Sequence, residues 1–178
     1  MDGDAEPRAL LVTGAMGVGK TSVIEELAEL LEDRGLSYAA IDLDWIGWFA
    51  APSRTDDEGP GHLVTPVLLR NLDALVRNYL DAGVGSFLLA RSIRERDEVD
   101  AVRGVMAMPL TVARLTLPFP EIERRLGSAV TSGRADDLAE AARWLAGSHG
   151  EGFEDFVVAN DRPIREVATD ILERLGWR

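Results

Sequence analysis

Short runs of apolar residues alternate along this chain with segments whose apolar residues recur at helical spacing. The apolar runs predict buried strands at residues 10–13, 38–41, 86–90, 110–117 and 156–159. The helical spacing predicts helices at residues 21–34, 63–82, 94–105, 121–126, 135–145 and 164–175. Because strands and helices alternate throughout, the pattern predicts an α/β fold in which helices cover both faces of a parallel sheet.

Glycine and proline mark several of the predicted boundaries. Gly35 and Gly176 follow predicted helices, where glycine commonly ends a helix. Residues 51–61, rich in proline, glycine, aspartate and serine, predict a surface loop, and residues 127–134 predict a loop of small residues. No linker or repeat divides the 178 residues, so we expect one domain over 1–178.

Charge and composition exclude several kinds of protein. The net charge of −12 gives the chain no general attraction to nucleic acid, so we expect no nucleic-acid partner. There is no cysteine, which excludes disulfides, thiolate zinc sites and cysteine nucleophiles. The two histidines, His62 and His149, are too few for a histidine metal cage, and we expect both in surface loops.

The N-terminus and the apolar runs bear on where the protein resides. Residues 1–8 are acidic and polar, unlike the start of a secretory signal. The apolar runs are only a few residues long, so we expect no membrane span or membrane partner, and a cytoplasmic location. The sequence makes no prediction of oligomeric state.

The strongest chemical signal is the motif G-x-x-x-x-G-K-T, the Walker A or P-loop pattern, at residues 14–21. It follows a predicted strand and opens a predicted helix, which is the context that a phosphate-binding loop requires. Lys20 is the one lysine among 19 basic residues, and it stands where the motif needs a cation. The motif predicts nucleotide contacts along residues 14–22, namely Gly14, Ala15, Met16, Gly17, Val18, Gly19, Lys20, Thr21 and Ser22.

The motif also assigns individual chemistry. Lys20 is expected to contact the β- and γ-phosphates of ATP as a catalytic residue, and the Thr21 hydroxyl to bind Mg²⁺. ATP and Mg²⁺ are therefore the predicted cofactors. A Ras-like G protein is disfavoured because no second lysine exists for a guanine-reading N-K-x-D segment. A motor ATPase is disfavoured because no acid follows the strand at residues 86–90.

Two carboxylates follow the second predicted strand. Asp42 and Asp44 would lie at the edge where parallel α/β sheets bind ligands, and on the same side if the strand continues. We expect Asp44 to act as the base for an acceptor hydroxyl and Asp42 to hold Mg²⁺ through water. The alternative is that one of the two caps the next helix.

Aromatic and basic side chains near these carboxylates predict an acceptor site. Trp45, Trp48 and Phe49 form either one planar wall of that site or a helix packed on the core. Arg91 and Arg94, with Arg96 beyond them, follow the third predicted strand. They would hold an anionic acceptor or the transferring phosphate, or else lie on a solvated helix face among Glu95, Asp97 and Glu98.

Several segments resemble P-loop small-molecule kinases of the nucleoside-monophosphate-kinase-like superfamily. The D-x-D at residues 42–44 is similar to the corresponding segment of adenylylsulfate and gluconate kinases, and chloramphenicol phosphotransferase-like proteins have an acid there. Residues 92–97 resemble a serine- and arginine-containing stretch of adenylylsulfate kinases. Residues 123–126 resemble the superfamily's E-R-L segment, and residues 157–161 its last strand and adenine-side loop. The resemblance covers about residues 10–175.

The resemblance implies the strand order 2-3-1-4-5 and a small lid at residues 127–134. It implies that the adenine lies near residues 160–163, which include Asn160 and Arg162. Arg124, Arg125 and Arg134 flank the expected lid, and Arg125 and Arg134 are the favoured catalytic arginines. The second arginine common after E-R-L is absent at its expected place, and the substrate segments of these kinases are not otherwise matched.

The sequence therefore predicts an ATP- and Mg²⁺-dependent phosphotransferase acting on a small hydroxylated molecule. The acceptor side would comprise Asp44, Trp45, Trp48, Arg91 and Arg94. The alternative is a nucleotide-dependent switch or regulator that binds a nucleoside triphosphate without a small acceptor.

Overall fold

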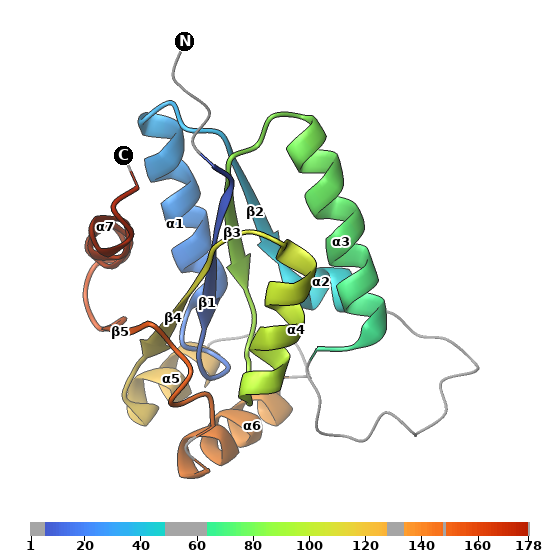
Figure 1. The fold of residues 1–178 in the computed structure, drawn as a ribbon. Helices are drawn as coiled ribbons and strands as arrows, with labels where there is room; N and C mark the ends of the chain where they lie inside the picture. Colours follow the sequence, from blue (N-terminus) through green and yellow to red (C-terminus); the bar gives the residue numbers. More distant parts are fainter. Residues whose placement is uncertain (1–5, 49–63, 128–133, 148, 178) are drawn as a thin grey trace.

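A five-stranded parallel sheet forms the centre of the computed structural model, which describes residues 6–48, 64–127, 134–147 and 149–177 (Figure 1). The strand order is β2-β3-β1-β4-β5, as the sequence predicted. The strands are β1 (Arg8–Thr13), β2 (Tyr38–Asp42), β3 (Ser86–Ala90), β4 (Leu110–Thr116) and β5 (Phe156–Ala159). The α/β fold predicted from alternating strands and helices is confirmed.

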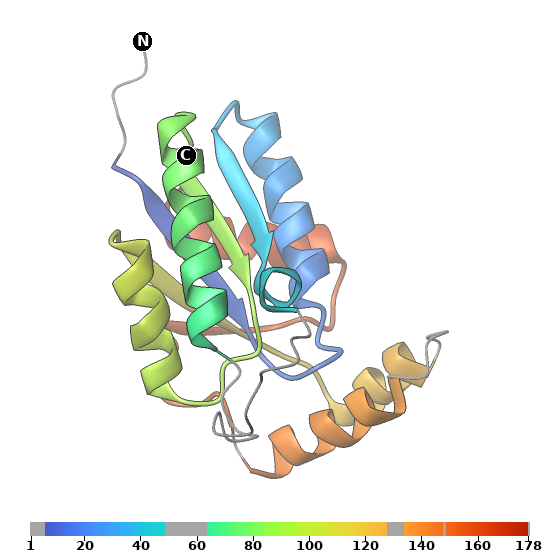
Figure 2. The ribbon, with the colours of Figure 1, turned by 90° about the vertical axis from the view of Figure 1, so that its right-hand side faces the viewer.

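Helices cover both faces of this sheet. Helices α1 (Lys20–Asp33) and α7 (Ile164–Leu175) lie on one face, and α3 (Pro66–Asp81) and α4 (Arg96–Met106) lie on the other (Figures 1 and 2). Three further helices lie toward the carboxyl ends of the strands: α2 (Leu43–Gly47), α5 (Phe119–Gly127) and α6 (Arg134–Ala146). Within the described ranges, no helix combines the length and apolar content needed to cross a bilayer.

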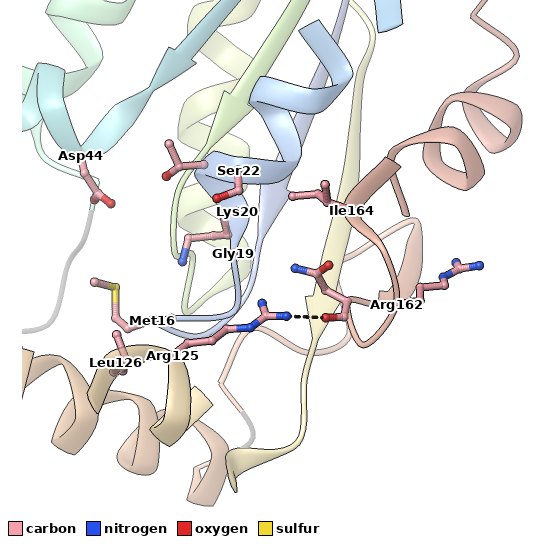
Figure 3. A pocket seen from close by; sticks show the side chains of 12 residues that line it. Met16, Gly19, Lys20, Ser22, Asp44, Arg125, Leu126, Arg162 and Ile164 are labelled. Carbon is pink, nitrogen blue, oxygen red and sulfur yellow. Dashed lines mark hydrogen bonds between the residues drawn. The ribbon is translucent and has the colours of Figure 1, made fainter. Parts of the chain in front are cut away.

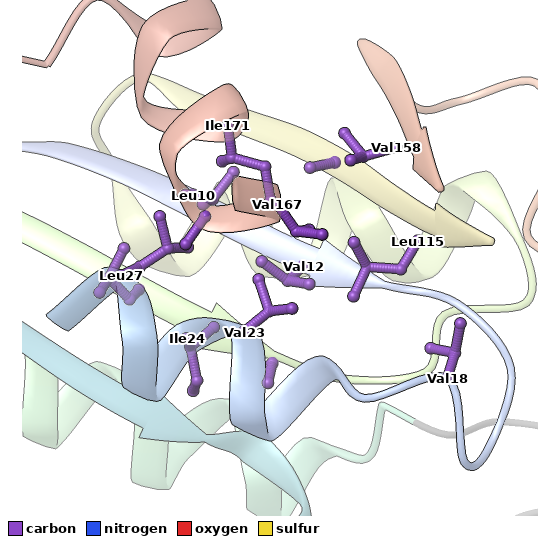
Figure 4. Close-up of a cluster of buried hydrophobic side chains, with 14 of the residues drawn as sticks. Leu10, Val12, Val18, Val23, Ile24, Leu27, Leu115, Val158, Val167 and Ile171 are labelled. Atoms are coloured by element: carbon purple, nitrogen blue, oxygen red, sulfur yellow. The ribbon is translucent and has the colours of Figure 1, made fainter. Parts of the chain in front are cut away.

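The central strand β1 contributes to a core on each face because its side chains alternate. Leu10 and Val12 pack toward α1 and α7, together with apolar residues of β4 and β5 (Figure 4). Ala9 and Leu11 pack toward α3 and α4. The runs of fully buried residues in β1 and β3 follow from this two-sided covering.

Several helix boundaries differ from those predicted. Helix α3 begins at Pro66 rather than at residue 63, because Thr65 is its N-cap and accepts a hydrogen bond from the Leu68 N–H at 3.3 Å. Helix α4 begins at Arg96 rather than at residue 94, because Glu95 is its N-cap. Helix α5 extends to Gly127, so that glycine is helical rather than part of a loop. Residues 128–133, the rest of the expected lid loop, lie outside the described residues, as does the predicted loop at 51–61.

The strand register places the chemistry-bearing residues at one edge of the sheet. Ala90 of β3 pairs with Val12 on one side and with Asp42 on the other. The segments that follow β1, β2 and β3 therefore begin side by side at the carboxyl edge. The segments after β1 and β2 line the cavity described below, and Arg91 after β3 pairs with Asp44.

Candidate active site

The glycine-rich loop at residues 14–19 turns tightly against its surroundings. Gly14 has φ +139°, and a Cβ there would lie 2.6 Å from the Leu115 carbonyl oxygen. Gly19 has φ +98°, and a Cβ there would lie 2.6 Å from the Asn160 side-chain nitrogen. Both positions need glycine for the backbone conformation and for the close approach.

Lys20, the first residue of α1, lies inside this loop and is only 7% exposed. Its ammonium donates to the carbonyl oxygens of Gly14 at 3.1 Å and Ala15 at 3.0 Å. Burial lowers the pKa of Lys20 from its usual 10.5 to about 8, although the charges of Asp44 and Asp42 oppose that shift. The amine is therefore held away from water, where a bound phosphate would favour its charged form and raise its pKa again.

Both carbonyl groups that Lys20 contacts have a second donor. The Ser92 hydroxyl donates to the Gly14 oxygen at 3.0 Å. The Val18 backbone N–H donates to the Ala15 oxygen at 3.3 Å. Lys20 can therefore turn toward a ligand without leaving either buried oxygen without a hydrogen bond.

A cavity of about 610 Å³ opens beside Lys20 (Figure 3). It is lined by Met16, Gly17, Gly19, Lys20, Thr21, Ser22, Asp44, Arg125, Leu126, Asn160, Arg162 and Ile164. Its volume falls within the range typical of small-molecule sites. The structure thus brings together most of the residues predicted to bind nucleotide, and it adds Asp44 at one end of the same cavity.

Thr21 and Asp42 form the pair predicted to hold magnesium. The Thr21 hydroxyl donates to one carboxylate oxygen of Asp42 at 2.7 Å. The other oxygen accepts the Asp44 N–H at 2.9 Å, so Asp42 is also the N-cap of α2. The chain turns into this helix after Asp42, so the strand does not continue through Asp44, and the alternative that one of the two carboxylates caps the next helix is confirmed for Asp42.

The donor set fits Mg²⁺, which prefers oxygen ligands and usually takes one or two from protein and others from phosphate and water. Thr21 and Asp42 supply a hydroxyl and a carboxylate within contact of each other. Among the residues that the structure describes, no group of three or more histidine, aspartate and glutamate side chains could hold a metal on its own. A magnesium ion at this edge would therefore depend on ligands from a bound nucleotide.

Arg91 and Arg94 are paired with carboxylates. Arg91, directly after β3, forms an ion pair with Asp44 of α2. Arg94 forms an ion pair with Glu140 of α6. The two arginine side chains are only 12% and 20% exposed, so neither lies on a solvated helix face.

The arginines predicted near the lid occupy different places. Arg125 of α5 donates to the Val18 carbonyl at 3.2 Å and to the Asn160 carbonyl at 3.0 Å, so it connects the P-loop to the segment after β5 (Figure 3). Arg124 is exposed and pairs with Glu121 on the same helix. Arg162 lines the cavity and pairs with Asp170 of α7. Arg134 begins α6, and its side chain lies outside the described part of the structure.

Comparison with solved structures identifies the fold. A sugar kinase from Janibacter sp. is 22% identical and superposes with a TM-score of 0.65 over 96% of this chain and 95% of that one. APS kinase of Mycobacterium tuberculosis, solved with AMPPNP and APS, is 20% identical with a TM-score of 0.60, covering 96% and 98%. The chain has the fold of P-loop small-molecule kinases.

The chain is also similar in fold to a third solved structure. The Deinococcus radiodurans tunicamycin resistance protein is 19% identical with a TM-score of 0.61, covering 97% of this chain and 98% of that one. No protein-family profile and no curated protein sequence matches the chain. At these identities the likeness concerns the kinase fold, and the chemistry has to be argued from the residues of this chain.

Within this kinase fold, Trp45 and Trp48 are surface residues. They are 68% and 76% exposed, and their ring centroids lie 5.3 Å apart at a tilt of 43°. The alternative that they pack on the core is therefore wrong for both residues. Phe49, the third aromatic residue of the predicted wall, lies outside the described residues.

Two residues near the site have roles that sequence reasoning missed. Ser92 is buried and holds the P-loop through its bond to the Gly14 carbonyl. Glu98 is buried in α4 and accepts backbone N–H groups of Val64 at 3.2 Å and Arg94 at 2.7 Å. The glutamates at 95 and 98 have the N-cap and N3 spacing of a capping box, and that spacing was the available signal for Glu98.

The histidines lie away from the cavity lining, as far as the structure describes them. His149 is exposed and meets the edge of the Trp144 ring, with centroids 6.0 Å apart. The prediction of a surface position is confirmed for His149. His62 lies outside the described residues.

Proposed function

We propose that this protein is an ATP- and Mg²⁺-dependent phosphotransferase that transfers the γ-phosphate to a hydroxyl group of a small molecule. One observation carries the proposal: Lys20 and Asp44 line the same cavity at the carboxyl edge of the sheet. A buried cation for phosphate therefore faces the space that also contains a carboxylate suited to accept a proton. A nucleotide switch without an acceptor would not need that carboxylate.

The nucleotide would lie along the P-loop. The loop's backbone N–H groups and the N-terminus of α1 would contact the phosphates, and Lys20 would contact the β- and γ-phosphates. The base would lie toward Asn160, Arg162 and Arg125, which line the other end of the cavity. Thr21 and Asp42 would hold Mg²⁺, which when bound neutralises charge on the phosphates.

The acceptor would approach from the side of Asp44. Its hydroxyl would give its proton to the Asp44 carboxylate while its oxygen forms a bond to the γ-phosphorus. The bond between that phosphorus and the β–γ bridging oxygen would break, and ADP would leave. Arg91 is a positioning residue in this scheme, because its ion pair with Asp44 fixes where that carboxylate lies.

Arginine closure over the phosphates remains part of the proposal. We propose that Arg125 acts on the nucleotide, because its hydrogen bonds to the Val18 and Asn160 carbonyl groups join the P-loop to the base side. Arg134, the first residue of α6, is proposed to act on the transferring phosphate. Phosphoryl transfer depends mainly on such positioning and charge neutralisation.

The experiment measures ADP release from ATP with a panel of hydroxylated small molecules, at several Mg²⁺ concentrations. We expect Asp44→Asn to lose roughly a hundredfold or more of acceptor-dependent turnover with little change in ATP affinity, since it loses a general base. Asp42→Asn should be partly rescued by high Mg²⁺, because its carboxylate acts through the metal. Asparagine caps helices about as well as aspartate, so the fold of α2 is kept.

The two variants serve as matched controls for each other. Full activity in Asp44→Asn, with Asp42→Asn inactive at every Mg²⁺ concentration, would mean that the two carboxylate roles are reversed. Full acceptor-dependent activity in both variants would disprove the carboxylate mechanism. Tight ATP binding with no acceptor-dependent ADP release would favour the nucleotide switch.

A further inference from the structure

Each of the two arginines on the acceptor side has a carboxylate partner. Arg91 is paired with Asp44, and Arg94 is paired with Glu140. Glu140 lies between two arginines, since Arg143 also pairs with it at 2.7 Å. A kinase acting on an anionic acceptor needs cations that are available to that anion, and these two arginines already hold carboxylates.

Two further carboxylates lie near Lys20. Asp42 lies beside Thr21 at the strand edge, 2.7 Å from its hydroxyl. Asp137 of α6 is close enough to Lys20 for its charge to raise the pKa of that amine, as do the charges of Asp44 and Asp42. An anionic acceptor would have to approach these carboxylates and the γ-phosphate together, which is electrostatically unfavourable.

The aromatic pair extends this acceptor side. Successive residues of a helix advance by about 100°, which places Asp44 and Trp45 away from the buried Leu43 of α2, and the ring of the C-cap residue Trp48 lies 5.3 Å from that of Trp45. Ile46 and Gly47 face α3 instead: the Ile46 carbonyl accepts from Asn71 at 2.7 Å, and a Cβ on Gly47 would lie 2.9 Å from Leu68. The two exposed indoles therefore belong to the same short segment as Asp44, which lines the cavity, while neither indole lines it.

Exposed tryptophan faces of this kind bind the flat apolar faces of sugar and aromatic rings. From the exposed indoles and the paired arginines together, we infer that the acceptor is a hydroxylated ring compound without a negative charge. Its ring stacks on Trp45 and Trp48 while one hydroxyl reaches Asp44. This inference rests on the proposed phosphotransfer and specifies its substrate class.

The intrinsic fluorescence offers a direct readout of binding. Of the four tryptophans, Trp45 and Trp48 are exposed, whereas Trp144 and Trp177 are only 3% and 4% exposed. A ligand that stacks on the exposed pair will quench the long-wavelength part of the emission. Trp45→Phe and Trp48→Phe keep a ring and identify which indole reports.

The probes are three pairs that share a ring and differ by a negative charge: methyl shikimate and shikimate, methyl glucoside and glucuronate, and uridine and uridine 5′-phosphate. Each is titrated with an ATP analogue and Mg²⁺ present, and ADP release from ATP is measured in parallel. We expect at least one neutral member to quench the exposed pair and to stimulate ADP release at least about tenfold more than its anionic partner. In the double variant Trp45→Ala/Trp48→Ala, KM for that compound should rise at least about tenfold while ATP affinity is kept.

A charge variant tests the same inference independently. Glu140→Gln removes the carboxylate that Arg94 contacts, so affinity for the anionic members should rise by up to about tenfold. Asp73→Asn removes a carboxylate from the exposed Arg77 pair on α3 and serves as the matched control, with no change expected.

The two readouts separate this inference from the proposed function. Stimulation by anionic members equal to or above that of their neutral partners would overturn the inference and leave phosphotransfer standing. Quenching by no neutral member would also overturn it. Quenching by a neutral member without ADP release from bound ATP would support the ring-binding surface and overturn phosphotransfer.

Discussion

Replacing Lys20 by methionine separates the lysine's contribution to nucleotide binding from its effect on stability. The side chain is nearly as long but carries no charge, and the site is buried enough to accept an apolar chain. The Gly14 and Ala15 carbonyls keep the Ser92 hydroxyl and the Val18 N–H as donors. Lys20→Met should therefore fold normally and lose ATP binding.

The magnitude follows from the lysine's pKa. Burial lowers that pKa from 10.5 to about 8, and a shift of one unit corresponds to about 1.4 kcal/mol. Below pH 8 the lysine is charged in both the folded and the unfolded chain, so folding bears the full cost of about 3 kcal/mol. Between pH 8 and 10.5 the unfolded chain binds more protons, so this cost falls as pH rises.

This pH dependence can be checked by urea unfolding of the wild-type chain and of Lys20→Met at several pH values between 7 and 10. The unfolding free energy of the wild type relative to the variant should rise by roughly 2–3 kcal/mol across that range. Titration with ATP and Mg²⁺ at pH 7 should show binding only to the wild type. If the unfolding free energies of the two proteins changed in parallel with pH, burial would not have lowered the pKa of Lys20. If both proteins bound ATP equally well, Lys20 would have no role in phosphate binding.

Three further predictions concern neighbouring positions. Gly19→Ala and Gly35→Ala each place an alanine at positive φ, which should cost about 1–2 kcal/mol of stability. Only the alanine at position 19 would also collide with Asn160, so thermal unfolding should show a further loss of about 1–3 kcal/mol for Gly19→Ala. Arg125→Met removes the link between P-loop and base side, so calorimetry should show ATP binding weakened about tenfold, while KM for the acceptor changes little. Glu98→Ala leaves buried N–H groups without an acceptor and should cost about 2–3 kcal/mol in urea unfolding, with Glu98→Gln restoring part of it.

The alternation of strands and helices and the glycine-rich turn after β1 were predictable from the sequence because each depends on local pattern. The strand order came from the resemblance to small-molecule kinases, and the structure has it. The P-loop is a contiguous motif, so residues 14–21 give its geometry without long-range information.

Pairings across the sequence could not be predicted. Arg94 and Glu140 are 46 residues apart, and Arg91 and Asp44 are 47 apart, so only the folded chain decides that each arginine has a carboxylate partner. The sequence also could not decide whether Trp45 and Trp48 are exposed, because a five-residue helix is too short for its periodicity to indicate a buried face. The role of Ser92 depends on the approach of the Gly14 carbonyl, 78 residues away.

The strand order also divides the site into two halves that can vary separately. On one side of β1, strands β2 and β3 lead into Asp44, the tryptophans and Arg91; on the other, β4 and β5 lead into α5 and Asn160. Segments after β2 and β3 could be exchanged for those of another protein of this fold while the loop after β1 and the segment after β5 stay in place. Under the proposed function, such an exchange would graft a new acceptor specificity onto the chain, and an unchanged ATP affinity would show that the other half is intact.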